Sequence, residues 1–233
     1  MTDRSARINL LEWITAKANW TIDKIVGLPG QILHRNVYSG ERLMPEFMPF
    51  VNWRRAHYER YYFAQELLKP TDVVLDLACG VGYGTAHLAE KCLSITGVDY
   101  SADTIKYALK NYQQKNCFFT TGDFFGFSTP DKFDVVVSFE TIEHIQAPIE
   151  KIIPSIMARA KRLVIGSVPY REAPGKNKYH YSFYLDEARF ELLHQYGKTT
   201  FYHQEKRPGF RIIKDQAVGT DPQNLIFVVE INP

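Results

Sequence analysis

The segment Glu-Thr-Ile-Glu-His at residues 140–144 brings two carboxylates and an imidazole together. Offsets of three and four residues place Glu140, Glu143 and His144 on one face if this segment is helical. A histidine with an intrinsic pKa of about 6.5 can accept a proton from an attacking hydroxyl group. We therefore predict a proton-transfer site with His144 as the general base, Glu143 beside it, and Glu140 in contact with a bound ligand. The competing interpretation is a surface helix with ordinary charged residues.

A strand, a glycine-rich turn and a helix are expected in the stretch that begins at residue 73. Glycine has no Cβ, so Gly80, Gly82 and Gly84 let the backbone turn tightly and approach a ligand, while the next helix presents its N-terminal amides there. Asp99 ends the next apolar segment, 19 positions after Gly80. That spacing is typical of a carboxylate that accepts from ribose hydroxyls in a βαβ unit. The pattern favours nucleoside binding over a plain tight turn.

The glycine spacing differs from that of a dinucleotide site. The dinucleotide pattern G-x-G-x-x-G needs a glycine where Thr85 stands, and here the third glycine comes one residue early. Asp76 lies inside the expected first strand, where a buried carboxylate needs partners. Backbone amides of the turn or an ammonium group of the ligand would supply them. These features disfavour a nicotinamide oxidoreductase.

Four segments resemble the motifs of the class I S-adenosylmethionine-dependent methyltransferases, in the order in which that family has them. They span residues 76–84, 97–99, 121–124 and 133–144. The resemblance is close over about residues 55–169. It implies S-adenosylmethionine as the cofactor and methyl transfer as the reaction. The cofactor contacts that it implies are Asp76, Ala78, Gly80, Gly82, Asp99, Tyr100, Asp123, Phe124 and Glu140.

The resemblance also assigns roles to residues at the ends of strands. Asp99 would hold both ribose hydroxyls, and Tyr100 would lie against the adenine ring. Asp123, together with the Phe124 amide, would read the amino edge of the base. The alternative role for Asp123 is a turn or helix cap after Gly122.

Residues 171–184 mix polar and aromatic side chains after the fifth expected strand. Rings with hydroxyl or imidazole tips suit a sugar or a phenol. A similar loop, with an N-x-x-H/Y character, occurs in methyltransferases of bacterial cell-surface glycan clusters. Segments 41–46 and 138–144 also resemble segments of those enzymes. The resemblance favours O-methylation of a sugar, a sugar nucleotide or a glycan, with His180 as a second candidate base.

Segment 140–144 is also similar to that of catechol O-methyltransferases of the ubiquinone pathway, in which carboxylates and a histidine can hold a divalent cation. This resemblance leaves open a metal ion at Glu140, Glu143 and His144, with a catechol or phenol as acceptor. The remaining alternatives are an N-methyltransferase acting on a small amine and a noncatalytic S-adenosylmethionine-binding protein.

The elements that must position these residues alternate between strand and helix, which predicts a doubly wound parallel sheet with its ligand at the carboxyl ends of the strands. The last two strands have only a loop between them and should pair as an antiparallel hairpin. The predicted fold is α/β, a Rossmann-like seven-stranded sheet, mostly parallel with an antiparallel C-terminal strand. The expected strands are near 72–77, 94–99, 117–121, 133–138, 162–168, 198–204 and 224–231.

Two domains are expected, a helical arm with a lid loop at residues 1–50 and the methyltransferase domain at 51–233. Apolar residues at three- and four-residue steps between Ile8 and Ile25 predict an amphipathic helix in the arm. A second helix at 51–68 would flank the methionine end of the cofactor. There Arg60 or Tyr61 would contact its carboxylate, or the helix would serve packing alone.

Composition points to one intracellular enzyme. A chain of 233 residues can bury a single large core. Its three cysteines show no C-x-x-C spacing, which suggests a reducing, cytoplasmic compartment. A net charge of +2 does not demand a nucleic-acid partner. No membrane span and no signal peptide are expected from the apolar runs and the polar N-terminus. The expected partner is a small-molecule or sugar acceptor, and a homo-oligomer stays open.

Overall fold

The computed structural model describes residues 52–206, 210–214 and 222–232. The chain divides into two units, Met1–His57 and Tyr58–Pro233, and the features below belong to the second, except for residues 52–57 at the start of the first helix described. The arm and lid loop expected at residues 1–50 lie outside the described residues. None of the helices described is long and apolar enough to span a bilayer.

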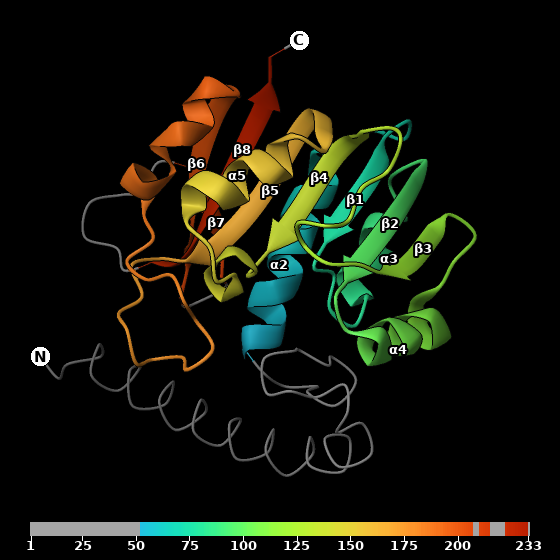
Figure 1. The fold of residues 1–233 in the computed structure, drawn as a ribbon, viewed down its shortest axis with the longest axis horizontal. Helices are drawn as coiled ribbons and strands as arrows, with labels where there is room; N and C mark the ends of the chain where they lie inside the picture. Colours follow the sequence, from blue (N-terminus) through green and yellow to red (C-terminus); the bar gives the residue numbers. More distant parts are fainter. Residues whose placement is uncertain (1–51, 207–209, 215–221, 233) are drawn as a thin grey trace, which may run out of the picture. The chain divides into compact units, whose positions relative to one another are not determined.

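Among the described residues, eight strands form one mixed sheet in the order β3-β2-β1-β4-β5-β8-β6-β7 (Figure 1). Strands β1 to β5 pair in parallel, whereas β8 is antiparallel to both of its neighbours, β5 and β6. The strands are β1 (Val73–Leu77), β2 (Ser94–Asp99), β3 (Cys117–Thr121), β4 (Phe133–Phe139), β5 (Ala160–Pro169), β6 (Gly197–Glu205), β7 (Ile212–Lys214) and β8 (Pro222–Ile231).

This sheet confirms the predicted α/β class and the antiparallel pairing of the last two expected strands. It has one strand more than the seven expected, because β7 lies in the stretch predicted to be a loop. β7 is three residues long and pairs with Tyr202–Gln204 at the edge of the sheet. Three residues are too few to show an alternating pattern, so the sequence carried no sign of this strand.

Helices cover both faces of the sheet, and Figure 1 shows α5 in front of β4 and β5. Successive strand residues point to opposite faces. Leu75 and Val98 therefore join the apolar core with α5, while Asp76 points to the other face, where it meets α3. The helices are α2 (Asn52–Glu66), α3 (Tyr83–Leu88), α4 (Ala102–Tyr112) and α5 (Ile149–Met157), with 3-10 helices η2 (Ile142–His144) and η3 (Glu187–Gln195).

Helix α5 shows why the sheet holds together under the site. Its isoleucines at 149, 152, 153 and 156 recur at helical spacing and are all buried in the core. Full burial of one such side chain is worth about 1.5–3 kcal/mol. The stripe therefore anchors α5 against the sheet and with it the segment between β4 and α5, which carries the residues predicted for proton transfer.

Candidate functional site

The loop between β1 and α3 takes left-handed backbone at three residues, with φ of +64° at Ala78, +56° at Gly80 and +91° at Gly82. At Ala78 this costs about 1–2 kcal/mol, because its Cβ crowds the following carbonyl. Gly84 does not belong to the turn as we expected; it lies in the first turn of α3. A Cβ there would lie 2.0 Å from Cζ of Tyr61. Gly84 therefore serves the packing of α3 against Tyr61.

Asp99 lies buried at the carboxyl end of β2, against the glycine loop. Its carboxylate accepts from the backbone amides of Gly80 at 3.2 Å and Ser101 at 2.9 Å. The Gly122 amide donates to the backbone oxygen of Asp99 at 3.0 Å, which ties the end of β3 to the same place. The predicted ribose carboxylate is thus held beside the turn, in a fixed position.

Asp76 is buried in β1, and its Oδ2 accepts from the Thr85 hydroxyl at 2.6 Å. Its Oδ1 has no hydrogen-bond partner among the residues that the structure describes. Burial raises the pKa of Asp76 to about 7. The hydrogen bond from Thr85 opposes this shift, and the negative charge of Asp99 adds to it. A buried acceptor without a donor is costly, so this oxygen is ready to receive an ammonium group.

The residues predicted to hold adenine lie at the ends of β2 and β3. Tyr100 is 69% exposed. Asp123 is exposed, and its Oδ1 accepts from the amides of Phe125 at 2.9 Å and Gly126 at 2.8 Å, which is the turn-capping role left open above. The Phe124 side chain is buried in the core. Asp123 caps this turn whether or not it also contacts a ligand.

Arg60, from α2, is buried with part of its guanidinium unpaired. Its Nη1 donates to Oε1 of Gln204 at 2.7 Å and to Oδ1 of Asn224 at 3.2 Å. Its Nε and Nη2 have no partner within residues 52–206, 210–214 and 222–232. A buried guanidinium with unused donors favours an anionic ligand. Of the two residues considered for the cofactor carboxylate, the structure leaves donors on Arg60, whereas the Tyr61 ring fills the space beside Gly84.

Glu140 follows β4 in left-handed backbone, with φ of +50°. The Ser167 hydroxyl donates to its Oε1 at 2.7 Å, and Nδ2 of Asn224 donates to its Oε2 at 2.7 Å. The helical face considered for segment 140–144 is absent, because the helical turn η2 spans only Ile142–His144. Glu140 is therefore hydrogen-bonded to Ser167 and Asn224, and it is not one of the three residues whose ligand atoms come together at Glu143, His144 and His180.

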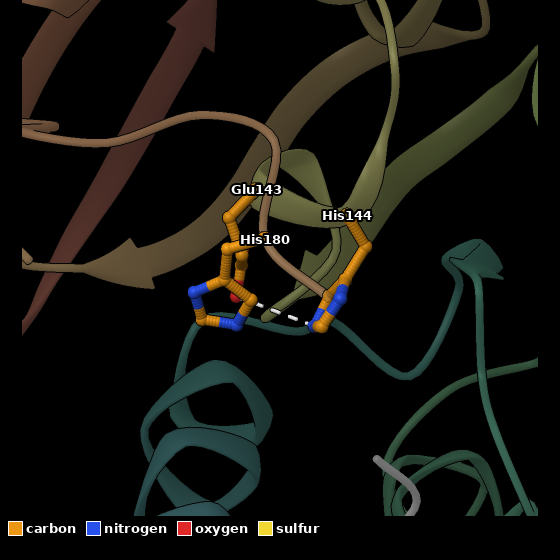
Figure 2. Close-up of side chains that lie close together, drawn as sticks. All are labelled: Glu143, His144 and His180. Atoms are coloured by element: carbon orange, nitrogen blue, oxygen red, sulfur yellow. Dashed lines mark ion pairs between the residues drawn. The ribbon is translucent and has the colours of Figure 1, made fainter. Parts of the chain in front are cut away.

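Glu143, His144 and His180 form the cluster shown in Figure 2. Glu143 is 1% exposed, and neither of its carboxylate oxygens has a hydrogen-bond partner in the described part of the chain. Nε2 of His144 lies 3.9 Å from Oε1 of Glu143. The His180 ring lies edge-on to that of His144, with ring centres 4.6 Å apart. One ligand atom from each of the three residues lies within 4.8 Å of the others.

Burial raises the pKa of the Glu143 carboxyl well above its usual range. The neighbouring Glu140 charge raises this pKa further, and the Arg60 guanidinium lowers it. Cations are therefore favoured beside Glu143, because they offset the cost of ionising it.

The two histidine rings are held by residues of the loop between β5 and η3. Nδ1 of His180 pairs with the Glu172 carboxylate, and its Nε2 lies 2.9 Å from Nδ2 of Asn177. Nδ1 of His144 lies 3.3 Å from the backbone oxygen of Tyr179. Of these partners only Asn177 had a sign in the sequence, its place three residues before His180; nothing in the residue pattern singled out Glu172.

Comparisons with known proteins relate the chain to methyltransferases in sequence and in fold. Residues 74–163 match a family model described as a methyltransferase domain. A phosphoethanolamine N-methyltransferase of Triticum aestivum is 30% identical over 132 residues, which cover 54% of this chain and 26% of that protein. The chain thus spans about a quarter of the length of this plant relative. A ubiquinone biosynthesis O-methyltransferase of Psychrobacter cryohalolentis is 24% identical over 208 residues, 78% of this chain and 79% of that protein.

Solved methyltransferases share the fold. The N-methyltransferase NodS from Bradyrhizobium japonicum, in complex with S-adenosyl-L-homocysteine, has a TM-score of 0.63 at 16% identity, covering 87% of this chain and 98% of that one. The complex of DhpI with the same ligand has a TM-score of 0.56 at 19% identity, covering 79% and 88%. Residues 74–163 therefore match the methyltransferase domain family in sequence, and the sheet to which they belong has the fold of solved S-adenosylmethionine-dependent methyltransferases.

Proposed function

We propose that the protein transfers the methyl group of S-adenosylmethionine to a hydroxyl group of a small molecule, and that this molecule is a sugar, a sugar nucleotide or a glycan. The observation that carries the proposal is the cluster of Glu143, His144 and His180, where β4 and β5 end. It offers proton acceptors at the carboxyl ends of the strands, the same edge of the sheet at which the cofactor residues are predicted.

The buried charges support a defined place for the methionine end of the cofactor. Burial raises the pKa of Tyr83. The charge of Arg60 lowers this pKa, and those of Asp76 and Glu140 raise it, so all three charged groups lie near the same ring. Oδ1 of Asp76 would accept from the ammonium group, and Nε and Nη2 of Arg60 would donate to the carboxylate. Each of these atoms lacks a partner among the described residues.

The nucleoside would lie across the ends of β2 and β3. The Asp99 carboxylate accepts from two amides, and a carboxylate can accept several hydrogen bonds, so ribose hydroxyls would be further donors to it. Tyr100 would cover the adenine, and Asp123 with the Phe124 amide would meet its amino edge. The left-handed backbone at Ala78, Gly80 and Gly82 brings the chain close to the same ligand.

His144 would take the proton of the acceptor hydroxyl. Its Nδ1 faces the Tyr179 carbonyl oxygen, an acceptor only, so the neutral ring carries its proton on Nδ1, and Nε2 would be the nitrogen that accepts the hydroxyl proton. S-adenosylmethionine, when bound, supplies a methyl group on a positively charged sulfur. The remaining task of the protein is alignment of the attacking oxygen with that methyl group, which is worth up to about 7–11 kcal/mol.

The loop at residues 171–184 supports a ring-bearing acceptor. Tyr181 and Tyr184 are each 58% exposed on it, and the Tyr181 amide donates to the backbone oxygen of Glu143 at 2.7 Å, so the loop adjoins the cluster. Aromatic faces with hydroxyl tips suit sugars and phenols. The similar proteins named above include both N- and O-methyltransferases, so amines and phenols belong in the same test.

A second candidate is a metal-dependent O-methyltransferase, favoured by the orphaned Glu143 carboxylate and its two histidine neighbours. A carboxylate with two imidazoles suits Mn²⁺, Fe²⁺ or Zn²⁺. The ligand set differs from the one expected from sequence, because Glu140 is already bonded to Ser167 and Asn224, and His180 takes its place. A metal ion held here would polarise the acceptor oxygen.

An acceptor screen tests the proposal. Sugar nucleotides, methyl glycosides, catechols and small amines are incubated with S-adenosylmethionine, and adenosylhomocysteine release is measured with EDTA or with added Mn²⁺. Turnover of a sugar hydroxyl that EDTA leaves unchanged is the expected result. Turnover that EDTA abolishes and Mn²⁺ restores identifies the second candidate. Turnover of amines alone contradicts O-methylation, and saturable adenosylhomocysteine binding without any turnover indicates a binding protein.

A further inference from the structure

The connection between β3 and β4, residues 122–132, contains no helix or strand, although all of it is described. Such a segment has no regular pattern of backbone hydrogen bonds, so its amides and carbonyls need other partners. The turn at its start, residues 123–127, follows directly on the end of β3, where the adenine is expected. The partners of this turn therefore determine how firmly the base is met.

Asp123 holds the amides of this turn. Its Oδ1 accepts from the amides of Phe125 at 2.9 Å and Gly126 at 2.8 Å, and its backbone oxygen accepts from the Phe127 amide at 2.9 Å. Both side-chain bonds use Oδ1, so Oδ2 would be the oxygen that accepts from the base. The Phe124 amide, which we assign to the ring of the base, has no hydrogen-bond partner among the described residues.

Arg159, the second residue after α5, holds the carbonyl oxygens of the same turn. Its Nη2 donates to the backbone oxygens of Phe124 at 2.9 Å, Phe125 at 3.1 Å and Phe127 at 2.7 Å. Its Nε donates to the Phe127 oxygen at 3.0 Å. The planar guanidinium presents these donors in a fixed arrangement, which the flexible ammonium of a lysine does not.

The guanidinium of Arg159 is itself held by α5. Its Nη1 donates to the backbone oxygen of Ser155 and, at 2.6 Å, to the Ser155 hydroxyl oxygen. The Ser155 carbonyl is one of the last four of the helix, which lack partners within it and favour a cation. Burial lowers the pKa of Arg159, and the charge of Asp123 raises it, so the two side chains that hold the turn lie near each other.

We propose that Arg159 is a positioning residue for recognition of the base: it fixes the turn at residues 123–127, so that the Asp123 carboxylate and the Phe124 amide meet the amino edge of the adenine in one arrangement. The inference rests on the proposed function, which puts the adenine at this turn. A fixed turn rejects hypoxanthine, whose oxygen would face the carboxylate and whose ring N–H would face the amide.

Arg162 provides a matched control three residues further along the chain. Its Nη2 lies 2.5 Å from Oδ2 of Asp72, just before β1, and its other hydrogen bonds in the described part of the chain go to Asp72 and Leu67. Asp72 is buried, so Arg162→Met breaks a buried ion pair and lowers stability. Because Arg162 does not bond to the turn, this variant reports the effect of lost stability on binding.

The test is calorimetric titration of the full-length protein with adenosylhomocysteine and with S-inosylhomocysteine, which carries hypoxanthine in place of adenine. The unmutated protein and Arg162→Met should bind adenosylhomocysteine at least about tenfold more tightly than the analogue. In Arg159→Met the affinity for adenosylhomocysteine should fall about tenfold and that for the analogue less than about threefold. The ratio of the two affinities should therefore collapse in this variant alone.

An unchanged ratio in Arg159→Met would overturn the inference alone. Equal binding of both ligands by the unmutated protein would overturn it together with the adenine assignment, and neither result depends on turnover of an acceptor. Arg159→Lys keeps the charge and serves if the unfolding midpoint shows that Arg159→Met is not folded. Its ratio should fall by about threefold or more, because the fixed arrangement of donors is lost, and full selectivity of a folded Arg159→Lys would also contradict the inference.

Discussion

At the scale of single residues, the site is marked by buried polar groups that the described part of the chain leaves unpaired. Asp76, Arg60 and Glu143 each have buried oxygens or nitrogens without a partner there. An unpaired buried polar group costs about 1–3 kcal/mol. The unpaired groups therefore destabilise the unliganded protein, and a ligand with complementary charges removes this cost. S-adenosylmethionine carries an ammonium group for Asp76 and a carboxylate for Arg60.

Asp99→Ala should weaken adenosylhomocysteine binding by about 1.5–3 kcal/mol, roughly 10- to 150-fold in Kd, because two ribose hydroxyls lose a charged acceptor. Calorimetric titration measures this effect. Asp103→Ala, which removes an exposed carboxylate in the first turn of α4, is the control and should bind normally. Equal affinity of Asp99→Ala and the unmutated protein would rule out the ribose assignment.

The raised pKa of Asp76, about 7, predicts a pH dependence of ligand binding. A ligand ammonium favours the ionised carboxylate, so adenosylhomocysteine affinity should rise as pH increases from about 5.5 to 7.5 and then level off. In the unliganded protein the sign is opposite: a folded pKa above the unfolded value of about 3.9 favours folding at low pH, and this contribution is lost as pH rises through 7. Calorimetry across this pH range should show the slope, and Asp76→Asn should remove it.

His144→Ala should lower kcat by roughly 10²–10⁴ while adenosylhomocysteine affinity stays nearly intact, because the lost group acts on the acceptor proton. Steady-state kinetics with the best acceptor from the screen, together with calorimetry, separates the two effects. If His144 served packing alone, its removal would lower the free energy of unfolding and leave kcat unchanged. Full activity of the His144→Ala variant would mean that the site works by alignment alone.

At the scale of elements, the antiparallel strand β8 explains how distant residues reach the site. Because β8 runs against β5, its first residues lie at the carboxyl end of β5, where Asn224 is paired with Pro169. Asn224 there accepts from Arg60 of α2 and donates to Glu140 after β4. A parallel strand in this position would bring its last residues to the same edge. The direction of β8 thus links α2 to the end of β4.

The contact between α2 and α3 predicts a stability effect at Gly84. A Cβ at this position would lie 2.0 Å from the Tyr61 ring, so Gly84→Ala must displace the ring and should cost about 1–3 kcal/mol of unfolding free energy. Gly126→Ala is the control, since its nearest neighbour would lie at 3.4 Å, an ordinary contact. Urea denaturation compares the two. Equal midpoints would show that the ring moves without cost.

At the scale of the whole molecule, the sequence was sufficient for the sheet and insufficient for the acceptor site. The alternation of strand-like and helix-like segments predicted every long strand, and the glycine loop and Asp99 lie next to each other as their spacing indicated. Segment 140–144 showed the limit, because a helical face was considered for residues that do not share one: the helical turn begins at Ile142, and Glu140 is bonded to Ser167 and Asn224. Partners that lie far apart in the chain leave no local pattern.

The most direct test of the proposed function is a crystal structure of the protein with adenosylhomocysteine. We expect the ligand ammonium at Oδ1 of Asp76, its carboxylate at Nε and Nη2 of Arg60, its ribose at Asp99, and its sulfur facing the cluster of Glu143, His144 and His180. A ligand bound with its sulfur turned away from this cluster, or one that leaves Asp76 and Arg60 unpaired, would contradict the assignment of the site.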